Sequence, residues 1–331
     1  GEVQVDGRIS ADGAPVSAYY ACAGSGGSVW ITCRTISGSG TVSASAVDHP
    51  TTGTQDVQFQ GGSGGRIAVH YDSTAQHAYD DSGCTVRFAA MGSVGHYAGD
   101  FAVVAGEGYL AHSDTRPQAV ADVGTLYFTD NRFLTNAAYR AAGWRFAGQW
   151  HSAVGAEERI AVPGSVLLDG VLDLPGQALQ LGIAGSLTVT GGHGRAAGLI
   201  LSNATASIAG DCTLRGGTLR LQGGLFSVGG DFRMAAYGQS PINASQLRIW
   251  SLATNGVDQP WGAQVTVGGT WTMESNTVVY VHAHASNGAA PHFTAGSFVC
   301  ARGATLDAYR TGYGATYGIG YPASQYVGAS H

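Results

Sequence analysis

The sequence contains no lysine, so all 16 of its basic residues are arginine. Charged residues make up only 11% of the 331 positions, against about 25% in typical soluble domains. The absence of lysine excludes a Schiff-base lysine, a P-loop lysine and lysine-based isopeptide cross-links. The net charge of −6 also argues against a nucleic-acid partner, because such partners need a basic surface.

Long apolar runs are missing as well. No stretch approaches the roughly 18 apolar residues that cross a membrane as a helix. The chain opens at Gly1 rather than at a methionine, and no signal peptide is visible. We therefore expect a processed or excerpted segment with no membrane span, for which the missing signal is uninformative about secretion.

Cysteine is scarce, with five in all, and no two of them form a CxxC pair. A zinc ribbon or a thioredoxin-type site is therefore not expected. Cys22 and Cys33 stand at the two ends of the glycine-containing segment ACAGSGGSVWITC, which can fold back on itself. We predict a disulfide between them in an oxidising compartment; the alternative is a pair of small buried thiols.

Glycine is abundant, at 52 residues, while helix-forming patterns are almost absent. Only the segment 136–146 has helix-like composition. Elsewhere apolar and polar residues alternate over four to eight positions between Gly, Asn or Asp, a pattern typical of short strands and turns. The sequence therefore predicts an all-β protein.

One unit recurs along the second half of the chain. It consists of an apolar residue, a small residue, glycine and then a polar–apolar alternation, as in IAGSLTVT, IAGDCTL, VGGDFRM, VGGTWTM and TAGSFVC. Its marker glycines are Gly185, Gly210, Gly230, Gly269 and Gly296, at spacings of 25, 20, 39 and 27 residues. A period in the twenties is one turn of a β-solenoid. We predict a parallel β-helix in which these glycines occupy equivalent corners. Glycines in general allow positive φ angles at corners between strands.

The prediction for domain organisation is one continuous solenoid over 1–331. It comprises looser Gly-rich coils at 1–135, a short insertion at 136–160, regular coils at 161–308 and a Tyr/Gly-rich tail at 309–331.

Several of these segments are similar to a known class of proteins. GGSVWITCRTISGSGTVSAS, GGSGGRIAVHY, GTLYFTDN and the VGGDFRM and VGGTWTM units resemble giant glycine-rich, parallel β-helix repeat surface proteins of environmental bacteria. The resemblance covers most of the chain and implies a secreted, cell-surface repeat protein. It implies no catalytic residue.

We expect a non-enzymatic extracellular structural or adhesive protein whose units associate head-to-tail, in a fibre or a tandem array. In the proteins that the chain resembles, a Tyr/Gly stretch runs on into a segment like the beginning of this sequence. Solenoid ends also leave strand edges unpaired. Residues expected at the end-to-end interface are Tyr309, Tyr313, Tyr317, Tyr321 and Tyr326. The alternative is that the tail itself caps the solenoid.

Two weak metal sites stand out, and no cofactor is otherwise expected. His282 and His284 alternate on a predicted strand and so share one face, but no third ligand is near. Asp80 and Asp81, with Asp72, form an acidic cluster of the kind that can hold calcium, without EF-hand spacing. The alternatives are a polar stripe and a solvated loop.

Sugar chemistry provides the competing function. Asn203 and Asn243 begin glycosylation acceptor patterns. Polysaccharide is a possible partner, and the alternative function is a polysaccharide lyase, hydrolase or glycan-binding β-helix. The side chains that can stack on sugar rings are Trp30, Trp144, Trp150, Trp250, Trp261 and Trp271. No compact acid/base pair is visible, so no catalytic residue is predicted.

Overall fold

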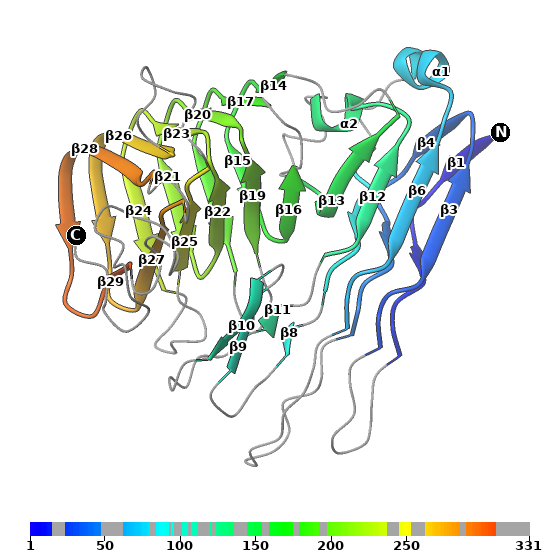
Figure 1. Ribbon diagram of the computed structural model, residues 1–331. Coiled ribbons are helices and arrows are strands. Elements are labelled where there is room, and N and C mark those ends of the chain that lie inside the picture. Colours follow the sequence, from blue (N-terminus) through cyan, green and yellow to red (C-terminus); the bar gives the residue numbers. More distant parts are fainter. Residues whose placement is uncertain are drawn as a thin grey trace.

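The structure is a computed structural model that describes residues 1–14, 24–47, 62–79, 84–92, 94–95, 101–104, 107–111, 119–120, 123–135, 144–153, 159–174, 179–191, 197–236, 245–252, 262–284 and 289–308. More than half of these residues are in strands, and most of the strands form two large sheets (Figure 1). Every strand pair in these two sheets is parallel. The all-β prediction is confirmed.

The second half of the chain builds three columns of parallel strands. Column 1 contains β14 (Arg159–Val162), β17 (Gln180–Ile183), β20 (Thr205–Ile208), β23 (Leu225–Val228) and the first halves of β26 (Ala263–Met273) and β28 (Pro291–Cys300). Column 2 contains β15 (Val166–Leu168), β18 (Leu187–Thr190), β21 (Cys212–Arg215), β24 (Phe232–Ala235) and the second halves of β26 and β28. Column 3 contains β13 (Phe146–Ser152), β16 (Val171–Leu174), β19 (Gly198–Ser202), β22 (Thr218–Gln222), β25 (Ser245–Trp250), β27 (Thr277–His282) and β29 (Thr305–Asp307).

The first half repeats this arrangement. Column 3 continues through β12 (Thr125–Phe128) and β6 (Arg66–His70) to β3 (Ser28–Thr32). The other pairs are β1 (Glu2–Gln4) with β4 (Thr35–Ser37), and β2 (Arg8–Ser10) with β5 (Thr41–Ser43) and then β7 (Arg87–Ala89). Two antiparallel pairs lie apart from these sheets: β8 (Val94–Gly95) with β11 (Ala119–Val120), and β9 (Phe101–Val104) with β10 (Glu107–Ala111).

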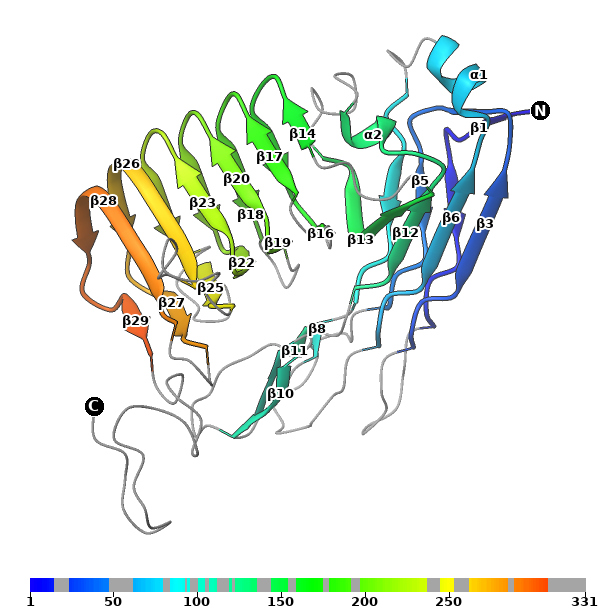
Figure 2. The ribbon, with the colours of Figure 1, turned by 45° about the horizontal axis from the view of Figure 1, so that its top comes forward.

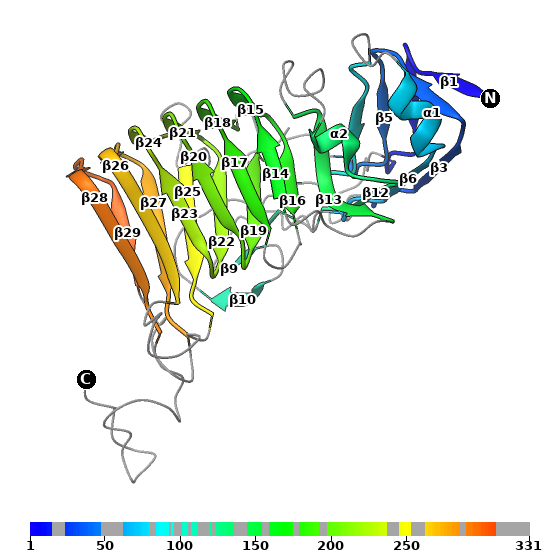
Figure 3. The ribbon, with the colours of Figure 1, turned by 90° about the horizontal axis from the view of Figure 1, so that it is seen from above.

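The chain visits one strand of each column in turn before it returns to the first column. We call each such set of strands a layer. Successive layers lie side by side from the first, β1–β3, to the last described, β28 and β29, at the opposite end of the molecule (Figures 1 and 3). The step between paired strands is 20–28 residues for most of the second half, as the 20 residues between Leu199 and Leu219 and the 28 between Leu219 and Leu247. The period read from the sequence is therefore the step from one layer to the next.

The core lies between the columns and is built from the inward residue of each alternating pair. In column 3, residues in the same register stack along the whole molecule, and all of the following are fully buried: Leu172, Leu199, Leu219, Leu247 and Val279. From Leu199 to Leu247, each of these side chains has a leucine or valine in the same register in both adjacent layers. The repeated apolar–polar alternation is thus sufficient to fill the core.

The marker glycines lie at the corner between columns 1 and 2, in contact with one another from layer to layer. Figure 2 shows the turns of this corner, after β14, β17, β20 and β23, side by side. The amide of Gly210 donates to the carbonyl of Gly185, and the amide of Gly230 donates to the carbonyl of Gly210, both at 3.0 Å. Equivalent corners are therefore confirmed for Gly185, Gly210, Gly230 and Gly269, whose amide donates to the carbonyl of Gly230, whereas Gly296 lies opposite both Gly268 and Gly269 at a register shift. Glycines with positive φ do occur between strands, as at Gly216, Gly223 and Gly224, but none of the five marker glycines has a positive φ. The corner requires glycine for close approach: a Cβ on Gly230 would lie 2.1 Å from Oδ1 of Asp211.

Two short helices lie beside the sheets. They are α1 (Ser73–Ala78) and α2 (Arg132–Thr135), and neither was expected from the sequence. The helix-like composition of 136–146 does not correspond to a helix at its described end, since Trp144 bridges Leu168 and Phe146 begins β13. Residues 144–153 of the predicted insertion are therefore part of the sheets.

Candidate functional site

The outer face of column 3 carries two rows of mainly polar and aromatic side chains. One register row along it contains Gln149, Asp173, Ile200, Arg220, Arg248, Tyr280 and Asp307. The next row contains Ser202, Gln222, Trp250 and His282. We call this surface the column 3 face.

Three side chains from successive layers form a stack on this face. The guanidinium carbon of Arg220 lies 4.7 Å from the ring centre of Trp250. On the other side, the rings of Trp250 and His282 are parallel within 4°, with centres 4.5 Å apart. Both faces of the indole ring are thus in contact with neighbouring layers. Trp250 stabilises layer-to-layer contact and has no open face for a sugar ring.

A second stack repeats this chemistry one row away. The guanidinium carbon of Arg248 lies 4.5 Å from the ring centre of Tyr280, and its Nε donates to Oε1 of Gln246 at 3.0 Å. Gln222 holds Arg220 in the same way: with its amide oxygen turned toward the guanidinium, it accepts from Nη2 at 2.8 Å. Like charges on paired strands repel, and these stacks and hydrogen bonds offset the repulsion between the two arginines.

The arginines also set the electrostatics of the face. Burial, together with the positive charges of Arg248 and Arg220, lowers the pKa of His282 to about 4, although Asp307 opposes the shift. His282 is therefore neutral at physiological pH. A neutral imidazole stacks on Trp250 without adding a third positive charge to this part of the face.

Asp173 is the most enclosed carboxyl group on the face. Burial raises its pKa, while the hydrogen bond from Nε2 of Gln149, at 3.0 Å, favours the charged form. The other carboxylate of the same row, Asp307, lies five strand spacings away, or roughly 24 Å at about 4.8 Å per strand. Glycoside hydrolysis needs two carboxyl groups about 5–10 Å apart, so these two cannot form such a pair.

A shorter aromatic stack begins in the first layer. The rings of Trp30 and His70 are stacked with centres 4.3 Å apart, and Tyr127 follows at 5.0 Å from His70. The outer side of Trp30 has no layer against it among the described residues, and its side chain is 71% exposed. Among the other described tryptophans, Trp144, Trp150 and Trp271 are buried in the core. Trp261 lies outside the described residues, and among the described tryptophans the predicted sugar-stacking surface reduces to Trp30.

The predicted metal ligands do not come together in the part of the chain that the structure describes. No group of three His, Cys, Asp or Glu side chains is found there. His282 ends β27 and stacks on Trp250, while the amide of His284 donates to the carbonyl of Ala289. Asp72 caps α1 by accepting from the amide of Ala75 at 3.0 Å. Asp80 and Asp81 lie outside the described residues.

Of the other predicted site residues, some lie within the described residues and some lie outside them. Asn203 is exposed in the turn between β19 and β20, with a φ of 47°. Asn243 and the tyrosines lie outside the described residues. The tyrosines are Tyr309, Tyr313, Tyr317, Tyr321 and Tyr326.

The predicted disulfide is not formed in this structure. Cys33 is a free thiol, and its Sγ lies 3.7 Å from the carbonyl oxygen of His70. Burial raises the pKa of Cys33. Cys22 lies outside the described residues, so pairing in an oxidising compartment stays a prediction. Burial also raises the pKa of Cys212, a core thiol of column 2.

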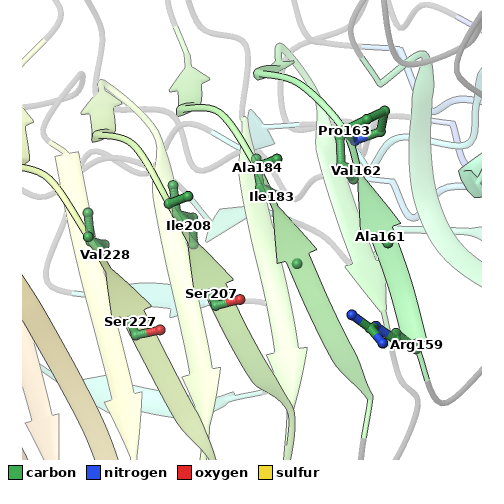
Figure 4. Close-up of a pocket in the computed structure, with 13 residues that line it drawn as sticks. Arg159, Ala161, Val162, Pro163, Ile183, Ala184, Ser207, Ile208, Ser227 and Val228 are labelled. Atoms are coloured by element: carbon green, nitrogen blue, oxygen red, sulfur yellow. The ribbon is translucent and has the colours of Figure 1, made fainter.

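A shallow groove of about 650 Å³ follows the outer face of column 1 (Figure 4). Its floor is formed by small residues in the same register, Ala161, Gly182, Ser207 and Ser227. Arg159 is the one charged residue among those that line it. The groove is an open part of the sheet face. The residues that line it include no pair of acid and base side chains.

No protein-family model, curated protein or solved structure matches the chain. Within the described residues, no helix has the length and hydropathy needed to span a membrane.

Proposed function

We propose that the chain is a non-enzymatic extracellular structural or adhesive protein, and that its layers are the coils of a parallel β-helix. In this proposal the stack of coils itself performs the structural or adhesive function. Its copies associate head-to-tail.

The observation that carries the proposal is the use of side chains for contacts between layers. On the column 3 face, the side chains of Arg220, Trp250 and His282 form one stack along the direction in which the layers follow one another. Such stacks strengthen each layer against its neighbours, as expected of a rod. Among the described residues of this face, they leave no open acid/base constellation of the kind that an enzyme needs.

A second ladder supports the same proposal at the corner between columns 1 and 2. After four of the five marker glycines, the amide of the next residue donates to a side chain in the layer before it. Asp231 N donates to Asp211 Oδ1 at 2.9 Å, and Thr270 N donates to Asp231 Oδ1 at 2.7 Å. Ser186 N likewise donates to Ser165 Oγ at 3.0 Å. Polar residues are therefore also used to join successive layers.

Shape and activity together test the proposal. Electron microscopy of the purified chain is expected to show rods, and a panel of neutral and acidic polysaccharides is expected to remain uncleaved. Release of reducing ends or of unsaturated sugars would contradict the structural function.

Glycan binding is the second candidate function, and the exposed indole of Trp30 favours it. Its first test is a titration of the chain with soluble oligosaccharides while tryptophan fluorescence is recorded. A shift that disappears in Trp30→Ala and persists in Trp250→Ala would support binding at Trp30.

A further inference from the structure

Exposed large hydrophobic side chains are concentrated at the two ends of the molecule. Seven are found among the described residues, and five of these lie in the first or the last described layer. They are Ile9 and Trp30 in the first layer and Phe298, Val299 and Leu306 in the last. Exposed apolar side chains that gather at specific places indicate interaction surfaces.

The last layer exposes core positions rather than surface positions. Phe298 is in register with Trp271, and Leu306 is in register with Val279. Trp271 and Val279 are buried because another layer covers them, whereas Phe298 is 49% and Leu306 51% exposed. The end of the apolar core is thus open on this side among the described residues.

The first layer also exposes a position that is buried in the other layers. Ile9 is in register with the fully buried Val42, yet it is itself 37% exposed. β3 pairs with β6 on one edge only, and β28 pairs with β26 on one edge only. Each end therefore offers an apolar surface together with unpaired backbone groups of edge strands.

We infer that the open face of the last layer binds the first layer of a second copy of this chain. In this contact β29 continues column 3 into β3 of the next copy, and the parallel pairing continues across the junction. The inference rests on the proposed structural function and specifies its contact: two different faces, with the same strand direction on both sides.

Strand direction decides between this contact and a symmetric one. All pairs in the two large sheets are parallel, so a first layer placed against a last layer extends each column with the pairing that it already uses. Two last layers placed against each other meet with opposed axes, and their strands run antiparallel. A contact between different faces that does not close on itself produces an open chain of copies.

Single-face variants test the contact. Phe298→Asp combined with Leu306→Asp blocks the last layer, and Ile9→Asp blocks the first. Leu167→Asp is the matched control, because Leu167 is equally exposed, at 52%, on β15 in the middle of the molecule. All of these sites are partly exposed, and the thermal midpoint of each variant reports whether its fold is intact.

Sedimentation is expected to show a mass that rises with concentration for the wild type and for Leu167→Asp. Each single-face variant should be monomeric alone, and an equimolar mixture of the two should form a dimer and nothing larger. Cys300, which is exposed on the last layer, should react more slowly with a thiol reagent as the wild-type concentration rises, as followed by peptide mass spectrometry.

Two results would overturn the inference. One is dimerisation of Ile9→Asp alone, which would show contact between identical faces. The other is a wild-type mass and a Cys300 labelling rate that do not change with concentration. Neither result would alter the rod shape of a single copy or the polysaccharide assays. Failure of this contact, and with it of head-to-tail association, is therefore distinguishable from failure of the non-enzymatic structural function.

Discussion

At the scale of single residues, the marker glycines show why small size matters more than backbone freedom in this fold. The space in which a Cβ of Gly230 would lie is occupied by Oδ1 of Asp211, which accepts a hydrogen bond from the amide of Asp231. A larger residue there would displace a side chain that joins two layers. Glycine is therefore required by the neighbouring layer.

Gly230→Ala is expected to lower the free energy of unfolding by roughly 1–3 kcal/mol, the usual cost of overpacking a tight site. Gly164→Ala is the matched control, because Gly164 stands at the same corner but has no atom within 4 Å of the added Cβ. Urea denaturation of both variants measures the difference. Equal stability of the two variants would contradict the close-approach explanation.

The histidine on the column 3 face gives stability a dependence on pH. The folded pKa of His282 is about 4, below the value of about 6.5 expected in the unfolded chain. Between these values the unfolded chain binds a proton that the folded chain does not. The free energy of unfolding contributed by His282 therefore decreases as the pH falls from about 6.5 to about 4.

His282→Phe is expected to keep the ring stack on Trp250 and to remove this titration. Chemical denaturation at pH 7 and at pH 4.5 should show a smaller loss of stability on acidification for the variant than for the wild type. An identical loss in both proteins would show that His282 is protonated equally in its folded and unfolded states.

At the scale of elements, α1 covers a strand edge by means of one side chain. β4 pairs with β1 on one side, and on its other side Gln76 of α1 takes the place of a strand. Oε1 of Gln76 accepts from the amide of Ile36 at 2.7 Å, and Nε2 donates to the carbonyl of Ile36 at 3.1 Å. Gln76 is fully buried, so the amide side chain satisfies backbone groups that water cannot reach.

Gln76→Ala is expected to destabilise the protein by roughly 1–3 kcal/mol, because it leaves buried backbone groups of Ile36 without these partners. His77→Ala, at the exposed neighbouring position of the same helix, is the control and should change stability by less than about 0.5 kcal/mol. Thermal unfolding of both variants provides the comparison. A Gln76→Ala variant as stable as the control would show that the edge of β4 is covered in another way.

At the scale of the whole molecule, each layer contacts only the layers beside it. Column 3 proceeds strand by strand from β3 to β29, and a middle strand such as β22 has a partner on both sides. The first and last described layers have a partner on one side only. Stability in such a stack is close to a sum over layers and their interfaces.

Hydrogen exchange is therefore expected to be fastest in β1–β3 and in β28–β29, and slowest in β19–β24, when the chain is dilute. Amide exchange followed by mass spectrometry measures this profile. Raising the concentration should slow exchange selectively at both ends if copies bind there. Uniform protection along the chain would show that the molecule opens as one cooperative unit.

Sequence reasoning was sufficient for the all-β class, the parallel stacking interval and the equivalence of the marker corners. These features repeat along the chain, and a repeated feature is visible as a period. Inward positions such as Leu199 and Leu219 recur because each meets the same neighbours in the adjacent layer. The local alternation of apolar and polar residues therefore predicts both a strand and the strand with which it pairs.

Only the tertiary structure decided which surface residues meet. Arg220, Trp250 and His282 are separated by 30 and 32 positions, and one of these steps contains the long segment between β25 and β26. A period search does not align them, and nothing local marks them as a stack. The same holds for Gln76 and Ile36, which are 40 positions apart and differ in secondary structure. Contacts between unlike elements depend on where the columns place them in space, and the sequence contains no period from which to read that placement.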